Sequence, residues 1–105
     1  MSTNEPRIYR VAIWFNEYRY SQIVIDPHYE VKHKGSISDE LILDLLRLNV
    51  DREEMLSDRE ESKEGYLYYV LHVIQGGRKY RLVFCTHEDR DLFVVLNCFR
   101  ESKRQ

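Results

Sequence analysis

The sequence predicts an α+β fold, built as an antiparallel sheet of four to five strands with one or two helices packed on one face. Three observations predict it: a C-terminal three-stranded meander over residues 66–99, an apolar stripe at helical spacing over residues 39–48, and an N-terminal hairpin over residues 8–25. A chain of 105 residues that is 43% hydrophobic has enough apolar side chains for one core. We therefore expect a single domain over residues 1–105.

The meander is predicted from three runs rich in β-branched and aromatic residues, Tyr66–Ile74, Lys79–Thr86 and Asp91–Phe99. Paired glycines at 76–77 supply the positive φ angles that a tight hairpin turn requires. A second, longer turn over His87–Arg90 precedes the last run.

Both faces of this meander are predicted to be apolar. Alternate residues of a strand point to the same face. In the first run the odd-numbered positions include Leu67, Tyr69 and Leu71, and the even-numbered positions are equally rich in apolar side chains. An antiparallel sheet with one face in water would alternate between apolar and polar residues. We therefore expect one face to be covered by a helix and the other by the N-terminal hairpin or a second polypeptide. An apolar surface left over would mark an interface, so we predict a homodimer or an obligate protein partner.

The N-terminal hairpin is predicted from two further β-rich runs, Ile8–Phe15 and Tyr20–Ile25, which are joined by a polar turn over Asn16–Tyr18. Before the first run, we expect residues 1–6 to form a disordered leader. After the meander, we expect residues 100–105 to form a charged tail.

Two helices are expected between the hairpin and the meander. The Asp-Pro pair at 26–27 suits the N-cap and first position of a short helix over His28–Lys34. Ser36 and Ser38 are both N-cap candidates for a longer helix over about Asp39–Leu48, which carries acidic residues in its first turn.

Residues 51–64 are dense in charge, with seven acidic and three basic side chains, and have only Met55 and Leu56 to bury. We expect a loop or a short exposed helix here, and the most mobile part of the domain.

The net charge of −2 is unevenly distributed. Residues 78–105 carry seven basic and four acidic side chains, and the basic ones could form a basic face or an ordinary solvated sheet edge: Arg78, Lys79, Arg81, Arg90, Arg100, Lys103 and Arg104. The chain lacks a run of about 20 apolar residues that would span a membrane and an apolar stretch over Met1–Arg10 that would direct secretion. We expect a cytoplasmic protein with no membrane association.

The cysteines predict no special chemistry. Cys85 and Cys98 both lie within apolar runs, where we expect reduced and buried thiols. Since the sequence has no CxxC pair and no Cys/His knuckle, we expect no metal site and no cofactor.

Histidine supplies one candidate for proton transfer. His33 stands between Lys32 and Lys34, whose charges would favour its neutral imidazole and make it a candidate general base. A plain exposed histidine is the alternative. We expect His72 to be a core or half-buried side chain and His87 to be exposed in a turn.

A second candidate site is the basic and aromatic group at the start of the second meander strand. Arg78, Lys79, Tyr80 and Arg81 follow one another, and cations beside an aromatic ring can hold phosphates and stack a base. Guanidinium groups can also stabilise the charge of an in-line phosphoryl displacement.

Three short stretches resemble the small toxins of bacterial toxin–antitoxin pairs in the RelE/ParE superfamily, in particular the BrnT-like branch. Lys32-His33 followed by Ile37–Leu41 is similar to the helix start of that branch. Tyr80–Phe84 resembles its "yRvlf" strand, and Leu96–Arg100 followed by Lys103 resembles its closing "lhxFxKK" segment.

The resemblance implies a ribonuclease that cleaves messenger RNA by metal-independent transphosphorylation and binds a small antitoxin. It assigns Arg81 and Arg100 to phosphate binding and transition-state charge, and His33 or Lys79 to the role of base or acid. The basic and aromatic group would bind nucleic acid through Arg78, Lys79, Tyr80 and Lys103. The alternative is a non-catalytic, dimeric protein-interaction domain.

Overall fold

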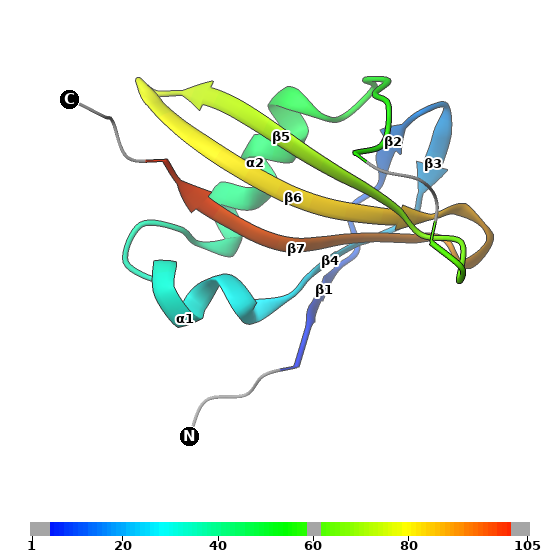
Figure 1. Ribbon diagram of the computed structural model, residues 1–105, viewed down its shortest axis with the longest axis horizontal. Helices are drawn as coiled ribbons and strands as arrows, with labels where there is room; N and C mark the ends of the chain where they lie inside the picture. Colours follow the sequence, from blue (N-terminus) through cyan, green and yellow to red (C-terminus); the bar gives the residue numbers. More distant parts are fainter. Residues whose placement is uncertain (1–4, 59–61, 102–105) are drawn as a thin grey trace.

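The computed structural model describes residues 5–58 and 62–101. Its main sheet has five strands in the order β1-β4-β7-β6-β5 (Figure 1). In that order the strands are β1 (Arg7–Tyr9), β4 (Ile23–Ile25), β7 (Leu92–Arg100), β6 (Arg78–His87) and β5 (Leu67–Gln75). The α+β class is confirmed. Neighbouring strands are antiparallel except β4 and β7, which are parallel, because the chain crosses to the far edge after β4 and returns beside it at the end.

The N-terminal hairpin is present, but each of its predicted strands is divided in two. Its outer parts are β1 and β4, and its inner parts form a separate two-stranded sheet of β2 (Ile13–Phe15) and β3 (Tyr18–Tyr20). Asn16 and Glu17 both have positive φ angles, as a two-residue hairpin turn requires. The interruption re-aims the inner hairpin, so that Ile13 and Phe15 are buried in the core.

The C-terminal meander is confirmed. Gly76 and Gly77 have φ angles of 61° and 77° and place β5 and β6 in continuous antiparallel register. The pairing of β6 with β7 shifts once, between Val83 and Phe84. A 3-10 turn over Glu88–Arg90 joins these two strands. The last strand continues through Arg100, which we had expected to begin the charged tail; residues 102–105 lie outside the described range.

Both predicted helical segments are present. The first is a 3-10 turn, η1 (Pro27–Tyr29), followed by the single α-turn α1 (Glu30–His33), and the Asp26 side chain accepts a hydrogen bond from the His28 amide. The second is α2 (Asp39–Asn49), which is capped by Ser38 through a 3.1 Å hydrogen bond from the amide of Leu41 to its hydroxyl.

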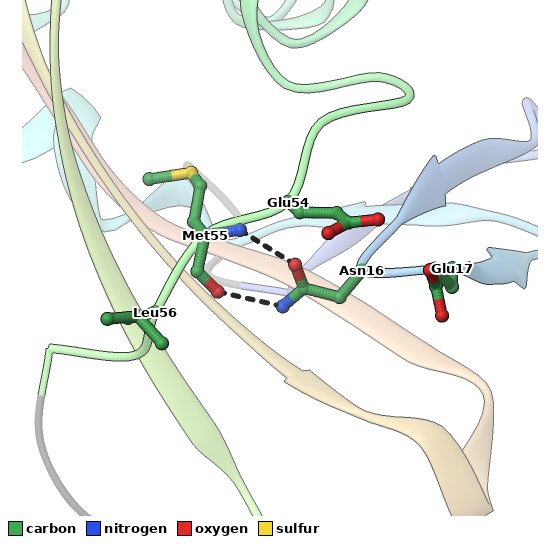
Figure 2. Close-up of a pocket in the computed structure, with 5 residues that line it drawn as sticks. All are labelled: Asn16, Glu17, Glu54, Met55 and Leu56. Atoms are coloured by element: carbon green, nitrogen blue, oxygen red, sulfur yellow. Dashed lines mark hydrogen bonds between the residues drawn. The ribbon is translucent and has the colours of Figure 1, made fainter.

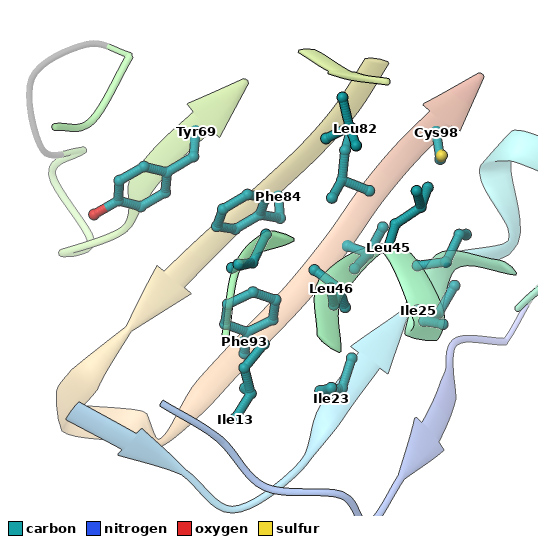
Figure 3. Close-up of a cluster of buried hydrophobic side chains, with 14 of the residues drawn as sticks. Ile13, Ile23, Ile25, Leu45, Leu46, Tyr69, Leu82, Phe84, Phe93 and Cys98 are labelled. Atoms are coloured by element: carbon teal, nitrogen blue, oxygen red, sulfur yellow. The ribbon is translucent and has the colours of Figure 1, made fainter. Parts of the chain in front are cut away.

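The core lies between α2 and one face of the sheet (Figure 1). Leu45 and Leu46 of α2 lie among the strand side chains in Figure 3, and both are fully buried. Phe84 and Phe93 stack at 4.9 Å between ring centroids, and Phe15 from the inner hairpin packs edge-on against both. The inner hairpin therefore covers the same face of the sheet as α2.

Asp39, the first residue of α2, ties the N-terminal strand to the helix. Its carboxylate accepts hydrogen bonds from the Arg7 guanidinium at 2.5 and 2.8 Å, from the Tyr9 hydroxyl at 2.5 Å and from the Tyr29 hydroxyl at 2.7 Å. Burial opposes ionisation of Asp39, but the hydrogen bonds from Arg7, Tyr9 and Tyr29 outweigh it and lower its pKa to about 2.

The charged segment after α2 is a loop whose first part is held down. The side-chain amide of Asn16 accepts a 2.8 Å hydrogen bond from the backbone N–H of Met55 and donates one of 3.1 Å to its carbonyl (Figure 2). The amide of Arg52 also donates a 2.6 Å hydrogen bond to the carbonyl of Trp14. Residues 51–58 are therefore fixed to the inner hairpin, and residues 59–61 lie outside the described part of the chain.

The second face of the sheet carries no packed helix or hairpin among the described residues, although α1 reaches its β7 edge at Phe99 and residues 64–65 lie against His87. We define this open face by the parity of Val83 and Cys85 on β6, which is opposite to the parity of the buried Leu82 and Phe84. The expectation that the N-terminal hairpin might cover this face is wrong, because the hairpin extends the sheet at its edge and folds its inner half over the helix side.

Candidate functional site

Three side chains form a transverse row at one end of the open face. His72 on β5 is paired with Arg81 on β6, and Arg81 is paired with Phe99 on β7. Paired residues on neighbouring strands project from the same face of the sheet, and adjacent strands are about 4.8 Å apart. An imidazole, a guanidinium and an aromatic ring therefore stand next to one another.

The helical segment α1 adds a second imidazole to this row. The ring of His33 stacks on the ring of Phe99 with 5.1 Å between centroids and 24° between planes. The Arg81 guanidinium carbon is 5.6 Å from the centroid of the same Phe99 ring. α1 lies beside the end of β7 (Figure 1), so His33 reaches the row from the sheet edge. We call His33, Phe99, Arg81 and His72 the row site.

Lys79 and Glu101 lie one step further along the same face. Lys79 is paired with Ile74, two residues along β6 from Arg81, and its carbonyl accepts a 2.7 Å hydrogen bond from the amide of Glu101. The Glu101 carboxylate is 2.9 Å from Nδ1 of His72. This hydrogen bond, together with the charges of Lys79 and Arg81, lowers the pKa of Glu101 below its usual range.

Two of the four predicted catalytic residues, His33 and Arg81, meet at the row site, and Lys79 lies on the same face. Arg100 does not join them, because it is paired with Tyr80 and projects from the opposite face at the end of β7. It lines instead a hollow of about 680 Å³ at the hairpin end, together with Arg78, Lys79 and the carboxylate-bearing Glu101.

The residues predicted to bind nucleic acid are divided by the sheet. Arg78 and Lys79 are exposed. The prediction that Tyr80 binds nucleic acid is wrong. Tyr80 is 6% exposed and belongs to the core on the helix side, so its ring is not available to stack on a base. Lys103 lies outside the described residues.

The prediction for His72 holds in its half-buried alternative and not as a core residue, and the prediction that His87 is exposed is wrong. The side chain of His72 is 51% exposed, because β5 is an edge strand and no described helix or hairpin packs on the open face there. His87 is 8% exposed, and its Nε2 lies 2.7 Å from the carbonyl oxygen of Glu64. A Cβ at Gly65 would lie 2.8 Å from that nitrogen, so the close approach of His87 depends on a glycine there.

Residue-level reasoning missed His72 and Glu101 as members of the site. For His72 a signal was present: a two-residue turn at Gly76-Gly77 fixes the register and places His72 opposite Arg81. The neighbourhood of Phe99 could not be read in this way, because the register shift between Val83 and Phe84 changes the pairing with β7.

A second hollow, of about 460 Å³, lies where the inner hairpin meets the loop after α2 (Figure 2). Glu17 and Glu54 line it, and the neighbouring Leu56 is 95% exposed. Carboxylates repel phosphate, so this hollow is not suited to nucleic acid.

Within residues 5–58 and 62–101, no three His, Cys, Asp or Glu side chains are grouped so that they could hold a metal ion. No helix among the described residues is long and apolar enough to cross a membrane. Comparison of the chain with family models, with curated proteins and with solved structures gave no match. The function must therefore be inferred from the row site itself.

Proposed function

We propose that this protein is a small toxin-like endoribonuclease that cleaves RNA at the row site. The observation that carries the proposal is the placement of the Arg81 guanidinium and the His33 imidazole against one ring, Phe99, on an open sheet face. A phosphodiester bound to Arg81 would lie within reach of an imidazole, and Lys79 would add positive charge on the same face.

This arrangement suits transphosphorylation of RNA. The 2′-oxygen attacks the adjacent phosphorus and its proton passes to His33 as general base. The bond from phosphorus to the 5′-oxygen breaks, and the leaving 5′-oxygen takes up one proton, so the proton lost at the 2′-oxygen is balanced. Arg81 and Lys79 stabilise the negative charge that develops on the non-bridging oxygens. The products are a 2′,3′-cyclic phosphate and a 5′-hydroxyl, so no co-reactant is consumed.

The test is to express the wild-type chain and Arg81→Ala and to score growth arrest and RNA cleavage. Loss of a cation that contacts the transition state should reduce cleavage by about 10²–10³-fold. Arg47→Ala is a matched control, because Arg47 is an exposed arginine on α2 that pairs only weakly with Asp44 at 3.5 Å. Equal growth with intact RNA in wild type and Arg81→Ala would exclude the ribonuclease.

Such an enzyme would act in the cytoplasm and be held inactive by a small antitoxin-like partner. The open face offers the surface for that partner, because the row site lies at one end of it. A protein bound there would cover Arg81 and exclude RNA.

A second candidate function is a non-catalytic, dimeric interaction domain. The apolar row that crosses the open face favours it: Ile8 is paired with Val24, Val24 with Val94 and Val94 with Cys85, and Ile8 is 56% exposed. A homodimer would appear by sedimentation equilibrium as twice the mass of the chain, and a monomer at all concentrations would contradict it.

A further inference from the structure

We propose that His72 is the general acid of the RNA cleavage and that Glu101 is its positioning residue. The inference rests on the proposed ribonuclease function and adds a second proton-transfer group to it. It is carried by the 2.9 Å contact between Nδ1 of His72 and the Glu101 carboxylate, and by the position of His72 across Arg81 from Phe99.

Cleavage of a phosphodiester needs two proton transfers at two places. The attacking 2′-oxygen loses a proton on one side of the phosphorus, and the leaving 5′-oxygen gains one on the opposite side, because displacement is in line. One imidazole cannot serve both positions at once. The row site has an imidazole on either side of Arg81: His33 beyond Phe99, and His72 on the neighbouring edge strand.

The order of the groups along the row matches this division of roles. β5, β6 and β7 are consecutive strands, so His72 and Phe99 stand about 10 Å apart with Arg81 between them. A phosphate on the guanidinium of Arg81 would thus lie between His72 and the ring of His33, whose centroid is 5.1 Å from that of Phe99. The two side chains would turn toward the phosphorus from opposite sides to reach its two bridging oxygens.

Glu101 fixes which nitrogen of His72 can act. Its carboxylate accepts the proton of Nδ1, which leaves Nε2 as the nitrogen that exchanges a proton with the substrate. The side chain of Glu101 is only 25% exposed and its amide is bonded to the carbonyl of Lys79, so the carboxylate is held by the end of the sheet. His72 is 51% exposed and can be reached by RNA.

Lys79 is the competing candidate for the acid. Its side chain lies on the same face, but Lys79 is paired with Ile74 and stands one step away from the row in which His72 is paired with Arg81. Lys79 is therefore assigned to charge stabilisation. In the cleavage step the His72 imidazolium, with its Nδ1–H on Glu101, donates its Nε2 proton to the 5′-oxygen as the phosphorus–oxygen bond breaks and is left as the neutral Nδ1–H tautomer, while His33 takes the proton of the 2′-hydroxyl.

The experiment compares two dinucleotide substrates, one with the natural 5′-oxygen and one with sulfur at that position. A thiolate leaves without protonation, so it bypasses the general acid. We expect His72→Ala to lose about 10²–10⁴-fold in cleavage of the oxygen substrate and to be close to wild type on the sulfur substrate. His33→Ala should be impaired on both. His28→Ala, an exposed imidazole on η1, is the matched control and should behave as wild type on both.

The role of Glu101 is tested with Glu101→Gln, in which the side-chain shape is kept and the charge is lost. We expect ¹⁵N spectra of the His72 ring to show the Nδ1–H tautomer in the wild type and a mixture of tautomers in Glu101→Gln. Cleavage of the oxygen substrate should fall while cleavage of the sulfur substrate is preserved.

The possible failures are distinct. If the wild type cleaves neither substrate, the ribonuclease function fails and this inference fails with it. If the wild type cleaves both but His72→Ala loses equally on both, the general-acid role is wrong and the ribonuclease function stands. Unchanged ¹⁵N spectra in Glu101→Gln would overturn the positioning role alone.

Discussion

The two faces of the sheet are built from the same strands and differ in what lies against them. On the helix side, Leu82 and Phe84 of β6 are fully buried under α2 and the inner hairpin. On the open face, Val83 is only partly buried, and Arg81 stands next to it in a row of ionisable and aromatic groups. A strand whose alternate residues are apolar on both faces therefore does not have to be buried on both faces.

Polar groups also behave differently on the two sides. At the rim of the helix side, the Asp39 carboxylate is saturated by four hydrogen bonds from Arg7, Tyr9 and Tyr29 and stabilises the fold. On the open face, His72 is accessible and uses Nδ1 on Glu101, which leaves Nε2 for a ligand, and Arg81 is half-buried beside the Phe99 ring. Saturated groups serve stability, whereas unsaturated groups near an open surface are free to serve chemistry.

The largest expected difference between the faces is in their tolerance of charge. Val94 and Val95 are adjacent on β7, but Val95 is 0% exposed under α2 and Val94 lies on the open face. Val95→Asp would bury a carboxylate among apolar side chains and cost about 3–5 kcal/mol, a large part of a small domain's stability. Val94→Asp should lower the free energy of unfolding by about 1 kcal/mol or less, because a surface substitution with a small loss of packing has an effect of this size.

Urea denaturation followed by circular dichroism measures both variants. A folded Val95→Asp with near wild-type stability would show that the helix side is not the core. A strongly destabilised Val94→Asp would instead show that the open face is buried in solution, as a homodimer would require.

Much of this contrast could be predicted from the sequence. The paired glycines, the Ser38 cap and the apolar stripe of α2 are local signals, and each is confirmed. The parallel pairing of β4 with β7 has no local signal, because it joins residues about 70 positions apart and depends on how the whole chain returns to the sheet.

The site was harder to predict than the fold for the same reason. His33 and Arg81 are recognisable as chemical groups, but their meeting depends on α1 packing against the end of β7. Tyr80 was misassigned because alternation along a strand fixes only relative orientation: Tyr80 and Arg81 must point to opposite faces, and residue type alone does not say which face is covered. His87 was misassigned because β6 extends further than the turn signals indicate.

A smaller effect is expected at the rim of the helix side. Asp39→Asn removes the charge that pairs with Arg7 and should lower the free energy of unfolding at pH 7 by about 1–2 kcal/mol, because the carboxylate is partly exposed to solvent. The pKa of Asp39 falls from its usual 3.8 to about 2 on folding. A carboxyl with a lowered pKa stabilises the fold above the unfolded pKa and loses that contribution as the pH falls through the folded one.

The difference in stability between the wild type and Asp39→Asn should therefore be constant above about pH 5 and shrink between about pH 4 and pH 2. Thermal denaturation across this pH range measures it. Asp44→Asn is a matched control, since Asp44 is an exposed carboxylate on the same helix with a single 3.5 Å contact to Arg47. A difference that persists unchanged at pH 2 would mean that the cluster does not depend on the charge of Asp39.

The smallest expected effect is a difference in reaction rate between the two native thiols, which is measured without any substitution in the core. Burial raises the pKa of Cys85 to about 11 and that of Cys98 to about 12, so both thiols are protonated at pH 8 and react with a disulfide reagent only when the structure opens. Cys85 is 4% exposed on the open face, whereas Cys98 is 0% exposed beneath α2.

Because opening the open face requires no helix to move, we expect Cys85 to react at least about tenfold faster than Cys98 in native protein. Cys98→Ala and Cys85→Ala assign the two phases, and release of the coloured thiol gives the rates. Equal rates would mean that both cysteines are reached through one global unfolding event and that the two faces do not differ in local stability. A Cys85 rate that falls as protein concentration rises would show that a second copy covers the open face, since only association protects one thiol and not the other.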